Sequence, residues 1–167
     1  MRLLNATILF LLLSACSNTN NETITTAYDP SVKKNYNAKQ LLQLHNTARQ
    51  KGGYCGSRKI NPSTDLTWST KLTTVAKRHS LDMAKNKFFG HIGSDRSNTK
   101  QRVNASGYQW EKYGENLAHR QPTPEIVFAA WLARKEHCRN ILDREFNEMG
   151  AAIVNGYWTV VFGKPAE

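Results

Sequence analysis

The sequence predicts an α+β domain in which helices pack on the faces of an antiparallel sheet. Two observations lead to this fold class. Apolar residues recur at helical spacing through most of the chain, and two β-prone runs near its end flank Asn155-Gly156. Helices followed by strands are typical of a sheet with helices packed on its faces. The 167 residues suit one domain with a core of its own.

The first helix is expected to begin after Asn37, a residue type favoured as an N-cap, and to end at Gly52-Gly53. A second and longer helix is expected to follow Ser69, another N-cap, and to end near Phe88. The two apolar faces have helical spacing. They comprise Leu41, Leu44, His45 and Ala48 in the first helix, and Leu72, Val75, Ala76, His79 and Met83 in the second.

Three further helices are expected in the second half of the chain. A short one follows the polar loop at 94–98 and is closed by Gly107. Thr123-Pro124 combines an N-cap with proline at the first helical position and therefore starts another. A last, shorter helix is expected over residues 137–142.

The clearest strand pair is the last segment. The runs Met149–Val154 and Tyr157–Phe162 are apolar and β-prone, and the intervening Asn155-Gly156 is the strongest two-residue hairpin signal. Trp68, Trp131 and Trp158 are expected in the core.

The N-terminal segment predicts export. Arg2, an apolar run over Leu3–Leu13 and small residues before Cys16 have the pattern of a secretory signal peptide, and the run is too short to span a bilayer. The ending Leu-Ser-Ala-Cys resembles the bacterial lipobox. This resemblance implies a signal peptide over residues 1–15, cleavage before Cys16, and acylation of Cys16 as the membrane anchor. The alternative is an ordinary signal peptide that contains a cysteine. Ser17 favours the outer membrane, by resemblance to Gram-negative lipoproteins.

Residues 16–36 are expected to form the lipidated cysteine and a flexible tether, and residues 37–167 the folded domain. The formal net charge is +10. It is compatible with anionic partners such as lipid headgroups or acidic envelope polymers, although generic basicity is the favoured explanation because the charges are scattered. We expect no nucleic-acid partner, because an exported protein has little access to nucleic acid, and we expect a monomer.

The cysteines other than Cys16 form one pair, Cys55 and Cys138. In an oxidising compartment such a pair predicts a disulfide, and two free thiols are the alternative.

Two histidines and a carboxylate stand beside glycines or at element boundaries, where side chains can project into a cleft. They are His91, Glu115 and His137. Imidazole and carboxylate groups are ligands for zinc or another divalent cation. The spacing by itself is weak evidence, because each histidine alone is more often structural. We expect His45, His79 and His119 to be structural, and His79 to bond a buried carbonyl.

Several short segments, in this order and spacing, closely resemble the CAP superfamily, which comprises cysteine-rich secretory proteins, antigen 5 and pathogenesis-related 1 proteins (SCP-like domains). The resemblance extends from about Ala38 to Phe162 and is closest to bacterial members, which supports the Cys55–Cys138 pair. The segments are LHNTAR at 44–49, LTW at 66–68, HSLDMA at 79–84, FFGH at 88–91, GY at 107–108, GENLA at 114–118 and HCRNIL at 137–142.

The resemblance implies a three-layer α-β-α sandwich with a large cleft that contains two histidines and two glutamates. His91 and His137 match the histidines, and Glu115 matches the first glutamate. Arg134 stands where eukaryotic members place the second glutamate, and Glu136 or Glu148 is the candidate to replace it.

Three functions remain open from the sequence. The first is a binding module for lipids, sterols or envelope polymers, with a divalent-cation site at His91, Glu115 and His137. The second is a metal-dependent hydrolase of protease type, in which the metal would activate water. The third is a structural or interaction protein whose cleft is unused. The sequence favours binding and leaves enzymatic activity undecided.

Overall fold

The computed structural model describes residues 38–167. The predicted signal peptide, Cys16, the tether and the Asn37 cap lie outside the described residues. The helices are α1 (Ala38–Lys51), α2 (Thr70–Asn86), α3 (Thr99–Ala105), α4 (Pro124–Leu132) and α5 (Lys135–Leu142). The strands are β1 (Gly53–Cys55), β2 (Arg58–Ile60), β3 (Thr67–Trp68), β4 (Trp110–His119), β5 (Glu148–Val154) and β6 (Tyr157–Pro165). Of these helices, none is both long and apolar enough to cross a bilayer.

The main sheet has the strand order β3-β5-β6-β4. Strand β6 pairs antiparallel with β5 and β4, whereas the short β3 runs parallel to β5. The predicted hairpin is confirmed. Its turn residues Asn155 and Gly156 have φ angles of 47° and 80°, the left-handed conformation that a two-residue turn of this type requires.

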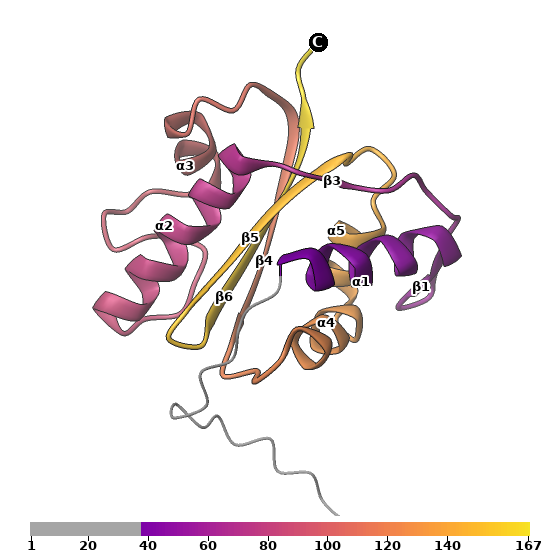
Figure 1. Ribbon diagram of the computed structural model, residues 1–167, viewed down its shortest axis with the longest axis horizontal. Helices are drawn as coiled ribbons and strands as arrows, with labels where there is room; N and C mark the ends of the chain where they lie inside the picture. The colour runs from indigo at the N-terminus through magenta and orange to yellow at the C-terminus, as the bar shows by residue number, and fades with distance from the viewer. Residues whose placement is uncertain (1–37) are drawn as a thin grey trace, which may run out of the picture.

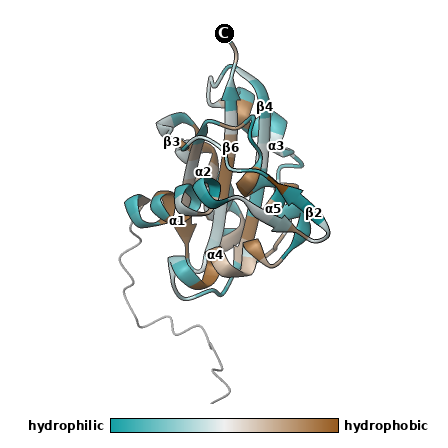
Figure 2. Cartoon of the chain, turned by 90° about the vertical axis from the view of Figure 1, so that its right-hand side faces the viewer, coloured by the Kyte–Doolittle hydropathy of each residue, from teal (hydrophilic) through white to brown (hydrophobic). Residues whose placement is uncertain are grey.

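Helices cover both faces of this sheet, so the predicted three-layer α-β-α sandwich is confirmed. Figure 1 shows α2 and α3 on one side and α1, α4 and α5 on the other. Alternate residues of β6 enter different cores: Val160 and Phe162 face the larger cluster, and Val161 faces the smaller one beside α2. Figure 2 shows hydrophobic colour along β6 at the centre of the molecule and hydrophilic colour on outward parts of the helices.

The helix start signals at Ser69 and Thr123 are confirmed. Each side-chain oxygen accepts a hydrogen bond from a backbone N–H in the first turn of its helix, and Pro124 occupies the first position of α4. The last predicted helix begins two residues earlier than expected, at Lys135.

The sequence analysis did not predict β4 or the small β1–β2 hairpin. The first half of β4, from Trp110 to Gly114, lacks the apolar alternation of a half-buried strand. Pairing with β6 over almost the whole strand, from Trp110 to His119, supplies the stabilisation that the local pattern does not indicate. As a result, the Gly-Glu-Asn segment lies in a strand at the sheet edge.

Two close contacts bind helices to the strands. Gly150 lets α2 approach β5 directly, because a Cβ there would lie 2.1 Å from the backbone nitrogen of Thr73. Cys55 and Cys138 form a disulfide, as the sequence predicts, with a Cα–Cα distance of 5.5 Å. This bridge attaches α5, which carries His137, to the β1–β2 hairpin.

Candidate functional site

His91 and Glu115 meet although they lie on different elements. His91 is in the loop after α2, and Glu115 is in β4. The His91 Nδ1 and Glu115 Oε1 atoms are 2.7 Å apart. The Glu115 side chain is only 2% exposed, whereas that of His91 is 55% exposed. The buried carboxylate therefore holds one ring nitrogen and leaves the imidazole open to solvent, which orients His91.

Arg102, on α3, completes a buried charge network around Glu115. Its Nη2 donates to Glu115 Oε2 at 2.8 Å and to Oε1 at 3.1 Å. The Thr99 hydroxyl donates to Oε1 at 3.0 Å. Arg102 also donates to the backbone carbonyls of Ser97 and His91, so one guanidinium fixes both the carboxylate and the loop that carries His91.

The sequence analysis missed Arg102. It lies in a short, polar helix with no pattern that distinguishes it from the exposed basic residues of this chain. Only its burial, with 2% of the residue exposed, marks it as part of the site. A buried arginine is uncommon without an acidic partner, but this burial is not visible in local sequence.

The network sets the ionisation of Glu115. Burial alone would raise the pKa of this carboxyl group, but the hydrogen bond from His91 and the positive charge of Arg102 outweigh burial. The net effect lowers the Glu115 pKa below its ordinary value. At neutral pH Glu115 is therefore ionised, and the positive charge of Arg102 balances its negative charge. A carboxylate with a lowered pKa is a weak base.

Two asparagines position His137 beside the same strand. Asn116 Nδ2, on β4, donates to the His137 carbonyl at 3.1 Å. Asn140 Nδ2, on α5, donates to Asn116 Oδ1 at 2.8 Å and to the Glu115 carbonyl at 3.3 Å. The first turns of α5 are thereby tied to the part of β4 that holds Glu115.

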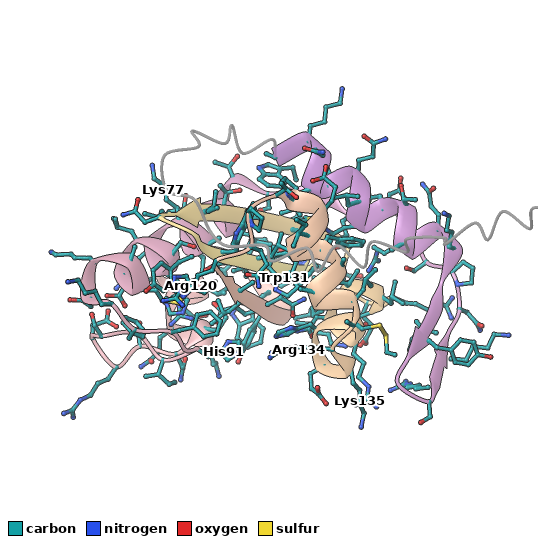
Figure 3. All side chains as sticks on the ribbon, turned by 90° about the horizontal axis from the view of Figure 1, so that it is seen from below. Lys77, His91, Arg120, Trp131, Arg134 and Lys135 are labelled. Carbon is teal, nitrogen blue, oxygen red and sulfur yellow. A yellow bond between two sulfur atoms is a disulfide. The ribbon has the colours of Figure 1, made fainter. Side chains whose placement is uncertain are left out.

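The pKa of His137 is set by burial and by its charged neighbours. Burial lowers the pKa of His137, the neighbouring Arg134 and His91 lower it further, and Glu136 opposes them. His137 is consequently neutral at pH 7. Figure 3 labels His91, Trp131 and Arg134 near one another in the middle of the view.

A cavity of about 170 Å³ lies beside His137. Aromatic side chains form part of its wall. The lining residues are Phe89, Leu117, Ala118, His119, Gln121, Ala130, Trp131, Arg134 and His137.

The two candidates for a second glutamate lie in different places. Glu136 is exposed in the first turn of α5, near His137. Glu148 begins β5 and lies beside the Tyr108 hydroxyl, whose pKa is raised by burial and by this carboxylate. Neither glutamate lines the cavity beside His137.

The histidines expected to be structural are held by the core or by ring contacts. His45 Nδ1 lies 2.8 Å from the Leu41 carbonyl, and full burial lowers the pKa of His45 to about 4. His79 Nε2 lies 2.8 Å from the Gly90 carbonyl, which confirms the expected bond and supports the turn before His91. His119 stacks on Tyr157 with ring centroids 3.8 Å apart.

The family model for the cysteine-rich secretory protein family, CAP, matches residues 42–162. This chain belongs to the CAP family. The chain is 31% identical over 146 residues to the uncharacterized protein YkwD of Bacillus subtilis, covering 86% of this chain and 53% of that protein. It is 27% identical over 126 residues to the uncharacterized membrane protein YlbC of the same organism, covering 75% of this chain and 34% of that protein. The chain thus spans between about a third and a half of the length of these relatives.

Solved structures share the CAP fold. An extracellular protein containing an SCP domain from Bacillus anthracis superposes with a TM-score of 0.68 at 23% identity, covering 76% of this chain and 40% of that one. An outer surface protein from Borrelia burgdorferi superposes with a TM-score of 0.61 at 17% identity, covering 77% and 90%.

The residues present do not suit the predicted three-ligand metal site. One CAP neighbour, NaASP2, was solved with Zn²⁺; it has a TM-score of 0.50 and 15% identity, covering 86% of this chain and 84% of that one. In residues 38–167 of this chain, no group of three or more His, Cys, Asp or Glu side chains could hold a metal ion. The Glu115 carboxylate is moreover already hydrogen-bonded to Arg102, Thr99 and His91. Zinc sites in proteins normally need three or four convergent ligands.

Proposed function

We propose that this protein is an exported CAP-domain lipoprotein that binds a ligand of the cell envelope in the cavity beside His137. The cavity carries this proposal, since it combines an aromatic and apolar wall with a few polar groups, as ligand sites commonly do. The predicted anchor at Cys16 would hold the domain at a membrane, where lipids, sterols and envelope polymers are available. The extracellular and outer-surface CAP proteins to which the chain is similar support an exported location.

Binding accounts for the site better than hydrolysis does. A general base should have a pKa near the working pH, whereas the Glu115 pKa is lowered and its carboxylate is paired with Arg102. Cys138, next to His137, is in a disulfide and offers no thiolate nucleophile. The polar groups near the cavity are therefore better suited to orient a bound molecule than to attack one.

Filling the cavity tests the binding function. Ala130 lines the cavity and Ala129, the preceding residue of α4, is exposed. We expect Ala130→Phe in the full chain to abolish the copurification of small molecules, because the added ring fills the cavity. Organic extraction followed by mass spectrometry measures them. Ala129→Phe is the matched control and should retain the wild-type set; identical extracts from the two variants would refute the binding function.

The anchor is tested separately. Cys16→Ala in the full chain should abolish metabolic labelling with palmitate and shift the protein from the membrane fraction to the soluble fraction, since several acyl chains are needed for stable anchoring. Unchanged membrane association in this variant would rule out the Cys16 anchor and leave the cavity proposal intact.

A further inference from the structure

The wall of the cavity beside His137 carries cationic and neutral groups and no carboxylate. Its polar side chains are those of His119, Gln121, Arg134 and His137. Neither Glu115, which is buried in an ion pair with Arg102, nor the exposed Glu136 lines the cavity. The electrostatic character of this cavity is therefore the opposite of that of a cation site.

Arg134 is the fixed positive charge of this wall. Its side chain is exposed at the rim, and in the part of the chain that the structure describes it has no hydrogen-bond or ion-pair partner. A guanidinium has a planar fork of N–H donors that matches the oxygens of phosphate or carboxylate groups. A free arginine at the mouth of a cavity is thus available for an oxyanion.

The first turn of α5 adds donors at the same place. Arg134 is the N-cap of α5 but makes no side-chain cap hydrogen bond, and His137, in that first turn, lines the same cavity. Uncapped backbone N–H groups at a helix start carry partial positive charge and bind anions.

Two buried polar atoms in this wall also lack partners among the described residues. They are His137 Nδ1 and Gln121 Oε1. Both residues line the cavity, so a ligand bound there would supply the partner that these two atoms lack. Rotation of the Gln121 amide would exchange its oxygen for an N–H donor.

We propose that the cavity beside His137 binds a phosphate group, held by the Arg134 guanidinium, His137 and the uncapped start of α5. This inference rests on the proposed binding function and names the chemistry of its ligand. The cavity has a volume of about 170 Å³. This is several times the roughly 30 Å³ that a water molecule takes up in the liquid, so a tetrahedral oxyanion fits. The phosphate belongs either to a lipid headgroup or to a free phosphate compound.

Titration calorimetry with two probes tests the inference. Inorganic phosphate and soluble dihexanoyl phosphatidic acid are titrated separately into the full chain at pH 7 and low ionic strength. We expect both to bind wild-type protein, and Arg134→Gln to weaken both about tenfold, the usual effect of losing one charge-assisted hydrogen bond. Tighter binding of phosphatidic acid assigns the site to a lipid headgroup, and equal affinity assigns it to a free phosphate compound.

Lys135→Gln is the matched control. It removes the same charge one residue away, but its side chain packs over Gly56 of the β1–β2 hairpin and does not line the cavity. This variant should bind as the wild type does. Equal loss in the two variants, equal binding in all three proteins, or no binding to the wild type would overturn the inference. The Ala130→Phe extraction remains a separate test, because a neutral ligand lost in that variant would preserve the binding function and refute only the phosphate.

Discussion

Replacing Arg49 by methionine is expected to lower the free energy of unfolding by about 3–5 kcal/mol, the range for removing one partner of a buried polar cluster. Arg49 is 0% exposed, and no ion pair to a carboxylate is among its described contacts. It donates instead to four backbone carbonyls, at 2.7–2.9 Å. They belong to Thr64, Ile141, Asp143 and Phe146.

The large effect follows from where these carbonyls lie. Ile141 and Asp143 stand at the end of α5, where helix carbonyls have no partner in the helix itself, and Phe146 leads into β5. The Arg49 guanidinium therefore caps the end of α5. It also joins α1 to the loop at Thr64 and to the segment between α5 and β5. Methionine fills a similar volume but leaves the carbonyls unpaired in a dry environment.

Urea unfolding at pH 7, followed by tryptophan fluorescence, measures this change. Arg78→Met is the matched control on α2, because Arg78 is about half exposed and only makes a surface ion pair with Asp95 at 2.9 Å. Such pairs contribute about 0–1 kcal/mol. If the two variants unfold at the same urea concentration, the buried arginine does not have the capping role assigned to it.

Arg102→Met should also cost about 3–5 kcal/mol, because it leaves the Glu115 carboxylate buried beside an apolar side chain. The Arg102 and Glu115 side chains are 1% and 2% exposed. The loop that carries His91 would lose its anchor as well, since Arg102 donates to the His91 and Ser97 carbonyls.

The pH dependence of stability distinguishes loss of the charge pair from simple loss of packing. The Glu115 pKa is lower in the folded protein than in the unfolded chain, so the pair stabilises the fold above the ordinary glutamate pKa. This contribution is lost as the pH falls through the lowered value. Without Arg102 the buried carboxyl group has a raised pKa, and Arg102→Met should lose less stability than the wild type does on acidification from pH 7 to pH 4.

The double variant Arg102→Met, Glu115→Gln provides the control. Because it removes both charges, it should be more stable at pH 7 than Arg102→Met alone. Urea unfolding at pH 7 and pH 4 measures all three proteins. Additive losses in the double variant, together with parallel pH profiles, would contradict a coupled ion pair.

Local chemistry made much of the fold predictable. The caps at Ser69 and Thr123 and the Asn155-Gly156 turn are each specified by a few adjacent residues, and the structure has them where they were expected. Strand β4 was not predictable in this way. Its first half has no apolar alternation, and it is a strand because β6 pairs with it.

The candidate site was predictable only in part. His91, Glu115 and His137 stand in recognisable motifs. The structure places His91 on Glu115, and it ties the His137 carbonyl to Asn116, the residue after Glu115. The role of Glu115 as a ligand was inferred from residue type, which cannot show that a guanidinium already occupies the carboxylate. The metal-site prediction therefore gains no support from the described residues.

The sequence by itself determined the family, the approximate positions of the helices and the final hairpin, because these depend on motifs and on local periodicity. The cysteine count favoured a disulfide, and the structure contains it. Only the tertiary structure decided that Arg49 and Arg102 are buried, that β4 is a strand, and that the wall beside His137 is cationic. The reason is physical. Burial and charge pairing arise from contacts between segments far apart in the chain, and an arginine in the core has the same local sequence signal as one in solvent.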